Sequence, residues 1–272
     1  MTTADADPFA SFKAAAREAW PSFAPVEIFT IRPAAELVKF AQVAAGQRVL
    51  DAACGTGVVA VTAARRGAKV SGLDLTPALL DRARYNAATA AVDIDFTEGD
   101  IETLPYPDSS FDVVLSQFGH IFAPRPALAV KQMLRVLKPG GCIAFSTWPA
   151  ESFVGRQFAF VARHMPAPPA GSEQPAPAAL WGDPNVIRER LGEEVTNLVF
   201  WRGTMILPSH SPEHSRIAQE KTSHAVARLV DVLKDDPAKL ARVRAEYVAL
   251  IAQHFDDNAV HSHFLMTRAV RT

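Results

Sequence analysis

The chain has 272 residues, 49% of them hydrophobic, and 28 basic against 29 acidic side chains give a formal net charge of −1. A chain of this length can bury a large core, and its near-neutral charge gives no electrostatic footprint for nucleic acid or an anionic membrane surface. The apolar runs are too short to span a membrane, and "MTTADADPFASF" lacks the basic and apolar regions of a signal peptide.

The first 148 residues predict two helices followed by alternating strands and helices. Residues 9–45 are typical of two helices that precede a sheet. The next segments predict, in order, strand "QRVLDA", helix "VVAVTAARRG", strand "KVSGLD", helix "PALLDRARYNAATAA", strands "DIDFTE" and "FDVVLSQ", helix "PALAVKQMLRVL" and strand "CIAFSTW". This alternation favours an α/β fold with a doubly wound parallel sheet, in which ligands bind at the carboxyl ends of the strands.

The character of the sequence changes after Trp148. "MPAPPAGSEQPAPAA" (165–179) predicts an extended, partly mobile loop, and residues 195–207 predict a strand. Residues 213–234 and 237–256 have helical periodicity, and "HSHFLMTRAVRT" predicts a last strand. We therefore expect four parts: an N-terminal helical segment (1–45), a ligand-binding core (46–150), a variable cap over the acceptor site (151–235), and a C-terminal helix with the last strand (236–272).

"VLDAACGTGVVA" (49–60) joins the first predicted strand to a helix through two glycines, Gly55 and Gly57. Glycines at such a junction let the backbone approach a ligand closely. Together with Ala60 they also fit the dinucleotide fingerprint, so an NAD(P)-dependent oxidoreductase is one alternative. Asp51 argues against it, because an acid at the strand end repels a pyrophosphate and suits a ligand that carries an ammonium and a sulfonium group.

Two more acids follow the next two strands. Asp74 ends the second strand, where a carboxylate can accept both hydroxyls of a ribose. Asp100 follows the third strand, where it could read an adenine edge together with the Ile101 amide. Each acid also has a purely structural alternative, because Asp51 and Asp74 could cap the turns that follow them and Asp100 could cap "IETL".

Four motifs in order identify the chain as similar to the class I S-adenosylmethionine (AdoMet)-dependent methyltransferases. They are "VLDAACGTG", "GLDLTPALLDRAR", "GDIETLPYPDSSFDVVLSQFGHIFAP" and "MLRVLKPGGCIAFSTW". More narrowly, the sequence resembles the small-molecule methyltransferases of ubiquinone and menaquinone biosynthesis over residues 29–148. The resemblance implies a Rossmann-like, mostly parallel sheet of seven strands, the last of them antiparallel, with AdoMet as the cofactor.

The resemblance also implies roles for single residues. Asp51, Gly55 and Gly57 would surround the methionine part of AdoMet, Asp74 would bind the ribose, and Leu75 would pack on the adenine. Asp100 and Ile101 would hold the adenine, Ser116 and Gln117 would line the methionine end, and Phe29 and Thr30 would approach from the N-terminal side. Ser116 and Gln117 also have the alternative of being ordinary polar residues at a strand end.

His120 is the candidate general base, because it follows the fourth strand on the side where the acceptor would lie. A packing role for this histidine is the alternative. No metal site is expected, because His261 and His263 lack an evident third ligand, and the two cysteines, Cys54 and Cys142, suit a reducing cytoplasm.

The expected activity is methyl transfer from AdoMet to an oxygen, nitrogen or carbon of a small aromatic or lipophilic acceptor. Several aromatic residues of the N-terminal and cap regions could line an apolar acceptor pocket: Trp20, Phe23, Phe153, Phe158, Trp181 and Trp201. Besides the oxidoreductase, a methyltransferase-like protein that binds a nucleoside without catalysis is an alternative. No nucleic-acid partner and no membrane span are expected, and the sequence leaves the oligomeric state open.

Overall fold

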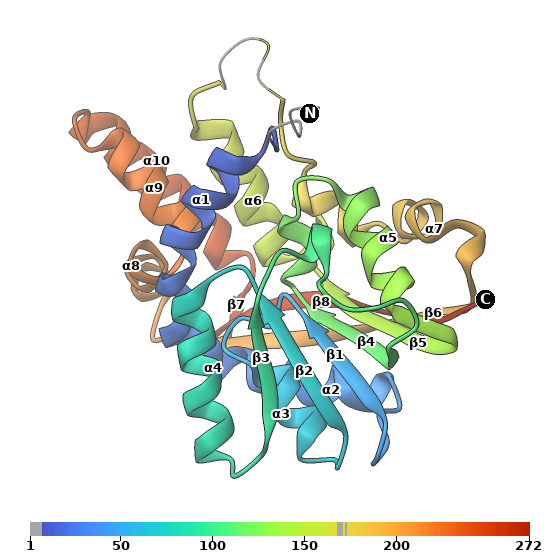
Figure 1. The fold of residues 1–272 in the computed structure, drawn as a ribbon. Helices are drawn as coiled ribbons and strands as arrows, with labels where there is room; N and C mark the ends of the chain where they lie inside the picture. The colour runs from blue at the N-terminus through green and yellow to red at the C-terminus, as the bar shows by residue number, and fades with distance from the viewer. Residues whose placement is uncertain (1–6, 168–170, 172) are drawn as a thin grey trace.

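The fold is a single mixed sheet with helices packed on both of its faces (Figure 1). The computed structural model describes residues 7–167, 171 and 173–272. Residues 1–6 of the N-terminal stretch and residues 168–170 and 172 of the predicted Pro/Ala-rich loop lie outside the described residues.

The strands follow the predicted order, and seven of them form a path β3-β2-β1-β4-β5-β8-β6 in an eight-stranded sheet. The first five strands pair in parallel. The additional strand, β7, has two residues and pairs only with β8. The strands are β1 (Arg48–Ala52), β2 (Lys69–Asp74), β3 (Ile94–Glu98), β4 (Phe111–Gln117), β5 (Leu137–Thr147), β6 (Val195–Pro208), β7 (Phe255–Asp256) and β8 (Ala259–Arg271). The predicted parallel, Rossmann-like sheet is thus confirmed.

The strand order reverses at β1, which has β2 on one side and β4 on the other. Leu50 pairs with Ser71 of β2 and with Val114 of β4, so β1 is central and buried on both faces. A reversal of this kind opens a crevice at the carboxyl ends of the strands. The glycine loop that follows β1 lies at this crevice.

The antiparallel end of the sheet is formed by the last part of the chain. Strand β8 pairs with β5 from Cys142–Val270 to Thr147–Leu265, as predicted for the final strand. Strand β6 pairs along β8 and forms the edge. The segment predicted as a cap therefore contributes one strand to the main sheet.

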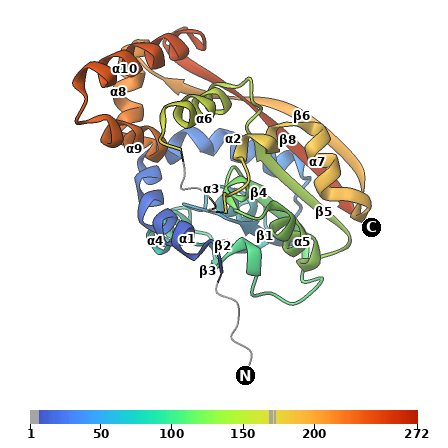
Figure 2. The same cartoon turned by 90° about the horizontal axis from the view of Figure 1, so that it is seen from above.

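Helices cover the sheet and form a second, smaller core at one end. The helices are α1 (Ala10–Ala19), α2 (Ile31–Phe40), α3 (Val58–Ala64), α4 (Pro77–Thr89), α5 (Pro126–Val136), α6 (Phe153–His164), α7 (Pro184–Leu191), α8 (Pro212–Thr222), α9 (His224–Leu233) and α10 (Pro237–Ala252). Figure 2 shows α8, α9 and α10 grouped at one end of the molecule, close to α6. Buried residues of α6, α9 and α10, such as Phe160, Leu229 and Tyr247, form that second core.

The segment after the fifth strand was expected to be a helical cap, but two of its helices were not located from the sequence. Helix α6 begins after Ser152, whose hydroxyl accepts a hydrogen bond from Gly155 N–H, and α7 begins after Asp183, which accepts one from Asn185 N–H. Both residues are typical N-caps, so this signal was present in the sequence. The Pro/Ala-rich segment between the two helices predicted an extended loop, and the helices on either side of it were overlooked.

The N-terminal region forms two helices, as predicted, with an irregular stretch between them. Helices α1 and α2 are joined by eleven residues of 3-10 helix, η1 (Trp20–Thr30), which contains Pro21 and Pro25. Proline limits regular α-helix, because it lacks an N–H donor and clashes with the preceding turn. The chain therefore continues as 3-10 helix between the end of α1 and the start of α2.

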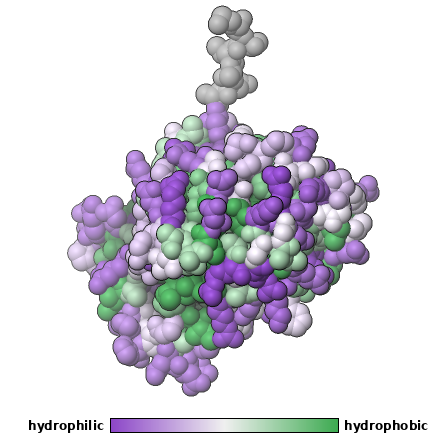
Figure 3. Space-filling view, turned by 60° about the horizontal axis from the view of Figure 1, so that its bottom comes forward, coloured by the Kyte–Doolittle hydropathy of each residue, from purple (hydrophilic) through white to green (hydrophobic). Residues whose placement is uncertain are grey.

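The surface is mixed in polarity. Figure 3 shows one face on which hydrophobic residues form patches between hydrophilic ones. Trp201 on the edge strand is 61% exposed, although most other aromatic residues are more buried. Within the described part of the chain, no helix combines the length and apolar character needed to cross a membrane.

Candidate functional site

The carboxyl ends of four neighbouring strands bring the predicted cofactor residues into one row. Asp100 follows β3, Asp74 ends β2, Asp51 lies near the end of β1, and Gln117 ends β4. Adjacent strands lie about 4.8 Å apart, so this row spans roughly 14 Å. An extended ligand along the sheet edge would meet the three acids in the order 100, 74, 51.

The glycine loop after β1 follows a left-handed path that brings its backbone to the row. Ala53, Gly55 and Gly57 have φ angles of 56°, 53° and 76°. A Cβ at Gly55 would have no heavy atom within 4 Å, whereas one at Gly57 would lie 3.0 Å from Ala83 Cβ. Gly55 therefore leaves open space beside the backbone, and Gly57 permits close packing of α3 against α4.

Asp51 is buried, and one of its carboxylate oxygens has no partner among the described residues. Its Oδ2 accepts a hydrogen bond from Ala60 N–H at 2.9 Å, so the predicted capping alternative holds for this oxygen. Oδ1 is buried without a partner. Burial, and secondarily the charge of Asp74, raises the pKa of Asp51 to about 8. An ammonium group placed against Oδ1 would supply both the missing donor and a compensating charge.

Asp74 holds the glycine loop. Its Oδ2 accepts a hydrogen bond from Gly55 N–H at 2.8 Å and its Oδ1 accepts one from Thr76 N–H at 2.9 Å. Burial raises the pKa of this carboxyl above its ordinary value. A carboxylate has about four acceptor sites, so two remain for ribose hydroxyls. The next residue, Leu75, is half-buried.

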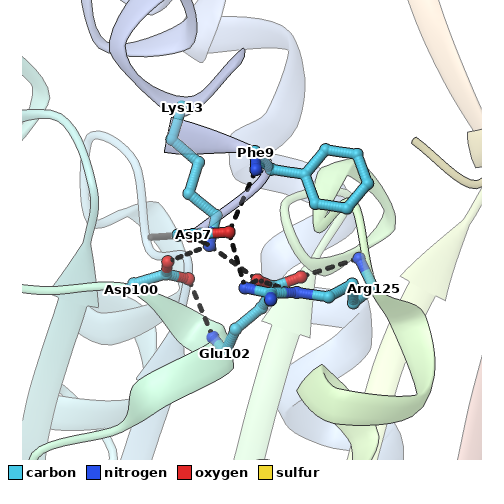
Figure 4. A network of polar contacts seen from close by, with 6 residues as sticks. All are labelled: Asp7, Phe9, Lys13, Asp100, Glu102 and Arg125. Carbon is cyan, nitrogen blue, oxygen red and sulfur yellow. Dashed lines mark hydrogen bonds and ion pairs between the residues drawn. The ribbon is translucent and has the colours of Figure 1, made fainter. Parts of the chain in front are cut away.

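Asp100 caps a short 3-10 helix and takes part in an ionic cluster (Figure 4). Its Oδ1 accepts a hydrogen bond from Glu102 N–H at 2.8 Å, as the capping alternative predicted, and Lys13 Nζ lies 2.6 Å from its Oδ2. Ile101, between the two acids, is 8% exposed. The sequence analysis did not identify the other members of the cluster, Asp7, Lys13, Glu102 and Arg125. Their contact depends on how α1 folds back onto the sheet.

The N-terminal segment reaches the site at two further places. Gln117 Nε2 donates to the carbonyl oxygen of Thr30 at 3.0 Å, so Thr30 and its neighbour Phe29 lie beside the end of β4. Glu27 is 8% exposed and accepts hydrogen bonds from Arg82 and Asn86 of α4. Asn86 also donates to the Thr56 carbonyl of the glycine loop at 3.0 Å.

Glu27 and Asn86 were missed by the sequence analysis. An isolated acid in the proline-containing stretch and an asparagine inside a helix give no local signal of partners 55 and 59 residues apart in sequence. Both residues connect the N-terminal segment to the loop that would hold the cofactor.

Ser116 and His120 lie together at the end of β4, and both are fully buried. Ser116 Oγ accepts a hydrogen bond from His120 N–H at 3.2 Å. The imidazole ring lies 4.7 Å from both the Phe145 and the Trp181 ring centroids, and neither ring nitrogen has a partner among the described residues. Burial, with a smaller effect of Arg190, lowers the pKa of His120 to about 3. These surroundings agree with the packing alternative, and the fully buried ring is closed to a ligand in this arrangement.

Half-buried aromatic side chains gather beyond the end of β4. Trp20 of η1 lies 4.6 Å from Phe122, and Phe122 lies 6.0 Å from Phe158 of α6, both measured between ring centroids. The other aromatic residues that we considered for an acceptor pocket are placed differently. Phe153 and Trp181 are buried in the two cores, Trp201 is exposed on the edge strand, and Phe23 is half-buried in η1.

The described residues contain one group of three acids close enough to share a metal ion: Asp7, Asp100 and Glu102. The ammonium group of Lys13 lies within 2.7 Å of an oxygen of each of them and already serves as their cation. His261 and His263 bond instead to the Asp256 carbonyl and to Thr204.

The chain resembles known methyltransferases in sequence. The family model described as "Methyltransferase domain" matches residues 49–141. An uncharacterized protein of Mycobacterium tuberculosis is 32% identical over 234 residues, which cover 86% of this chain and 84% of that protein. The demethylmenaquinone methyltransferase of Deinococcus radiodurans is 38% identical over 123 residues, which cover 44% of this chain and 51% of that enzyme.

The fold has solved counterparts. One is the phosphoethanolamine N-methyltransferase 2 of Haemonchus contortus, determined with S-adenosyl-L-methionine. It is 18% identical with a TM-score of 0.51, and the match covers 86% of this chain and 51% of that chain.

Proposed function

The chain belongs to the class I AdoMet-dependent methyltransferases, and on that premise we propose that it methylates a small aromatic or lipophilic acceptor. Family membership removes the support for an oxidoreductase. The proposal concerns which residues hold the cofactor, what kind of acceptor is used, and whether the protein supplies a base.

The buried Oδ1 of Asp51, which has no partner among the described residues, is the observation that carries the cofactor assignment. A dinucleotide pyrophosphate at this place would set negative charge against a buried carboxyl, whereas the ammonium of AdoMet would donate to it. Gly55 and Gly57 would let the backbone approach the methionine part, and Phe29, Thr30, Ser116 and Gln117 would enclose it. Asp74 and Leu75 would hold the ribose and cover the adenine, and Asp100 and Ile101 would hold the adenine edge.

When bound, AdoMet supplies a methyl group that its sulfonium already activates for in-line displacement. The chain's own contribution would then be alignment of the acceptor and exclusion of water, and alignment alone can lower a barrier by roughly 7–11 kcal/mol. The row of three carboxylates beside the glycine loop supports this role, because it would hold the cofactor in one orientation.

Trp20, Phe122 and Phe158 support an apolar acceptor. They come from three separate segments, η1, η3 (His120–Phe122) and α6, and each ring is only half-buried. Aromatic rings that meet in this way offer faces against which a flat apolar molecule can stack. The relative in Deinococcus radiodurans is named for such an acceptor, a demethylated menaquinone, which agrees with this class.

His120 remains the candidate base only for an acceptor whose binding exposes its buried ring. An acceptor that is already a good nucleophile, such as a thiolate or an ionised phenol, needs no base. We propose that acceptors of this second kind are preferred, because His120 is fully buried between Phe145 and Trp181.

The test has two steps. Calorimetry with S-adenosylhomocysteine and with NADH determines the ligand, and we expect micromolar affinity for the first only. Turnover of methyl-labelled AdoMet is then measured with matched phenols, quinols, thiols and amines. Binding without turnover of any acceptor would favour a non-catalytic nucleoside-binding protein, and absence of a thermal shift with millimolar S-adenosylhomocysteine would overturn the cofactor assignment.

A further inference from the structure

Lys13 lies at the centre of the ionic cluster that joins the N-terminal helix to the loop after β3 (Figure 4). Its ammonium is 2.6 Å from Asp100 Oδ2, 2.6 Å from Glu102 Oε2 and 2.7 Å from Asp7 Oδ2. The residue is 9% exposed, which is unusual for a lysine. Burial by itself would lower the pKa of Lys13, but the hydrogen bonds to the three carboxylates outweigh it and raise that pKa to about 12, so the cation persists at neutral pH.

Arg125 provides the second cation of the cluster. Its backbone N–H and its guanidinium donate to Glu102 at distances of 2.6 to 3.0 Å, and Glu102 is fully buried. Three carboxylates thus face two cations. The surplus negative charge suits a ligand edge that carries hydrogen-bond donors, such as an exocyclic amino group.

Asp100 is the only member of the cluster that is also a predicted ligand residue, and its carboxylate is held from both sides. Glu102 N–H fixes Oδ1, and Lys13 fixes Oδ2. The Asp100 side chain retains 21% exposure, so the group held in this way is still open to a ligand. The contact to Lys13 comes from α1, which lies 87 residues earlier in the chain and also reaches the end of β3 through the ion pair of Arg17 with Glu98.

We propose that Lys13 is a positioning residue for the cofactor, which orients the Asp100 carboxylate so that it accepts the hydrogen bond of the adenine amino group. The inference rests on the proposed function, because it takes Asp100 to be the adenine ligand. Lys13 itself would not touch the reacting methyl group, so its loss should affect cofactor affinity and leave the rate at saturating cofactor nearly unchanged.

The experiment compares Lys13→Met and Lys13→Arg with a matched control on the same helix. The control is Arg17→Met. Arg17 forms an ion pair with Glu98 at 2.8 Å, both side chains are about half exposed, and the pair lies outside the cluster. Calorimetry measures the affinity of each full-length variant for S-adenosylhomocysteine and for S-inosylhomocysteine, in which a carbonyl oxygen replaces the adenine amino group.

We expect Lys13→Met to weaken S-adenosylhomocysteine binding about tenfold, the usual scale for losing an oriented charge-assisted hydrogen bond. Lys13→Arg should stay within about threefold of the unaltered protein, and Arg17→Met should have no effect. With S-inosylhomocysteine the effect of Lys13→Met should fall below about twofold. That ligand has no amino group to donate a hydrogen bond to Asp100.

Two results would overturn the inference: unchanged affinity of Lys13→Met, or an equal loss for both ligands, which a merely structural role would produce. If Lys13→Met does not fold, Lys13→Gln, which keeps an amide donor, undergoes the same comparison with the same criteria. Failure of the unaltered protein to bind S-adenosylhomocysteine would instead refute the proposed function, so the two failures are distinguishable.

Discussion

The carboxylate of Asp74 accepts a hydrogen bond from the backbone N–H of Gly55 at 2.8 Å. The acid that ends the second strand therefore holds the loop that follows the first strand. A residue proposed to bind the ribose also sets the shape of the loop proposed to hold the methionine part, so the two halves of the cofactor site depend on each other.

Replacement of Asp74 tests this coupling. We expect Asp74→Ala to weaken AdoMet binding by about 1.5–3 kcal/mol, because the ribose loses charged acceptors and Gly55 loses its anchor. Calorimetry provides the measurement. The control is Asp81→Ala on α4, whose side chain is 78% exposed and which should bind normally. An unchanged affinity of a folded Asp74→Ala protein would remove Asp74 from the ribose site.

Binding of the cofactor should release a proton near neutral pH. Asp51 has a pKa of about 8 when no cation faces it, so it is mostly protonated at pH 7, and an ammonium group favours its ionised form. Affinity should therefore rise by about five- to tenfold from pH 6.5 to pH 7.5 and level off above pH 8.

Calorimetry in phosphate and in Tris buffer measures this release, because the two buffers differ in ionisation enthalpy. The observed binding enthalpy should differ between them for the unaltered protein and agree for Asp51→Asn, which has no proton to lose. Equal enthalpies for both proteins would mean that Asp51 is already ionised before binding.

His120 should make stability sensitive to acid. The pKa of this residue is lowered from 6.5 to about 3 in the folded protein. Its unfolded form binds a proton as the pH falls below 6.5 and its folded form does not. The unfolding free energy is therefore unaffected by the protonation of His120 above pH 6.5, and it decreases progressively as the pH falls from 6.5 towards 3.

Urea unfolding at pH 7.5 and pH 5.5 would show this effect. The drop in unfolding free energy between the two pH values should be about 1 kcal/mol smaller in His120→Phe than in the unaltered protein. Arg190, which lies over Trp181, is kept unchanged in both proteins. An identical drop in the two proteins would show that His120 takes up a proton in the folded state.

The same residue should matter little for turnover if it only packs. We expect His120→Asn to retain kcat within about tenfold and to show no inflection near pH 6.5, the position that an ordinary exposed imidazole would give. Initial rates at saturating AdoMet from pH 5.5 to pH 8.5 provide the measurement. A loss of at least about 100-fold with unchanged AdoMet affinity would establish His120 as the base.

The two loop glycines should respond differently to alanine. Gly57→Ala places a Cβ 3.0 Å from Ala83 Cβ and 3.2 Å from Phe96, in addition to the strain of a positive φ. We expect it to lower the free energy of unfolding by about 2–4 kcal/mol. Gly55→Ala meets no atom within 4 Å and should cost only about 1 kcal/mol, mostly from strain. Chemical unfolding ranks the two variants, and the opposite order would contradict this account of the loop.

Local sequence determined the order of the main strands, the helices up to β5 and the identity of the loop. Alternating apolar runs, two glycines after the first strand, and acids at three consecutive strand ends are all short-range signals. Parallel strands present their carboxyl ends at one edge, so these signals also indicate where the site lies. The positions of Asp51, Asp74 and Asp100 in one row follow directly from that rule.

Only the tertiary structure decided which side chains support or enclose that row. Lys13 and Glu102 are separated by 89 residues and Glu27 and Asn86 by 59, so no local pattern could reveal their contacts. His120 looked accessible from its position after β4, yet Phe145 and Trp181, from distant segments, bury it. Burial and pairing of polar groups arise from packing between remote segments. For that reason the charge state of these residues and their accessibility to a ligand could not be predicted from the sequence around them.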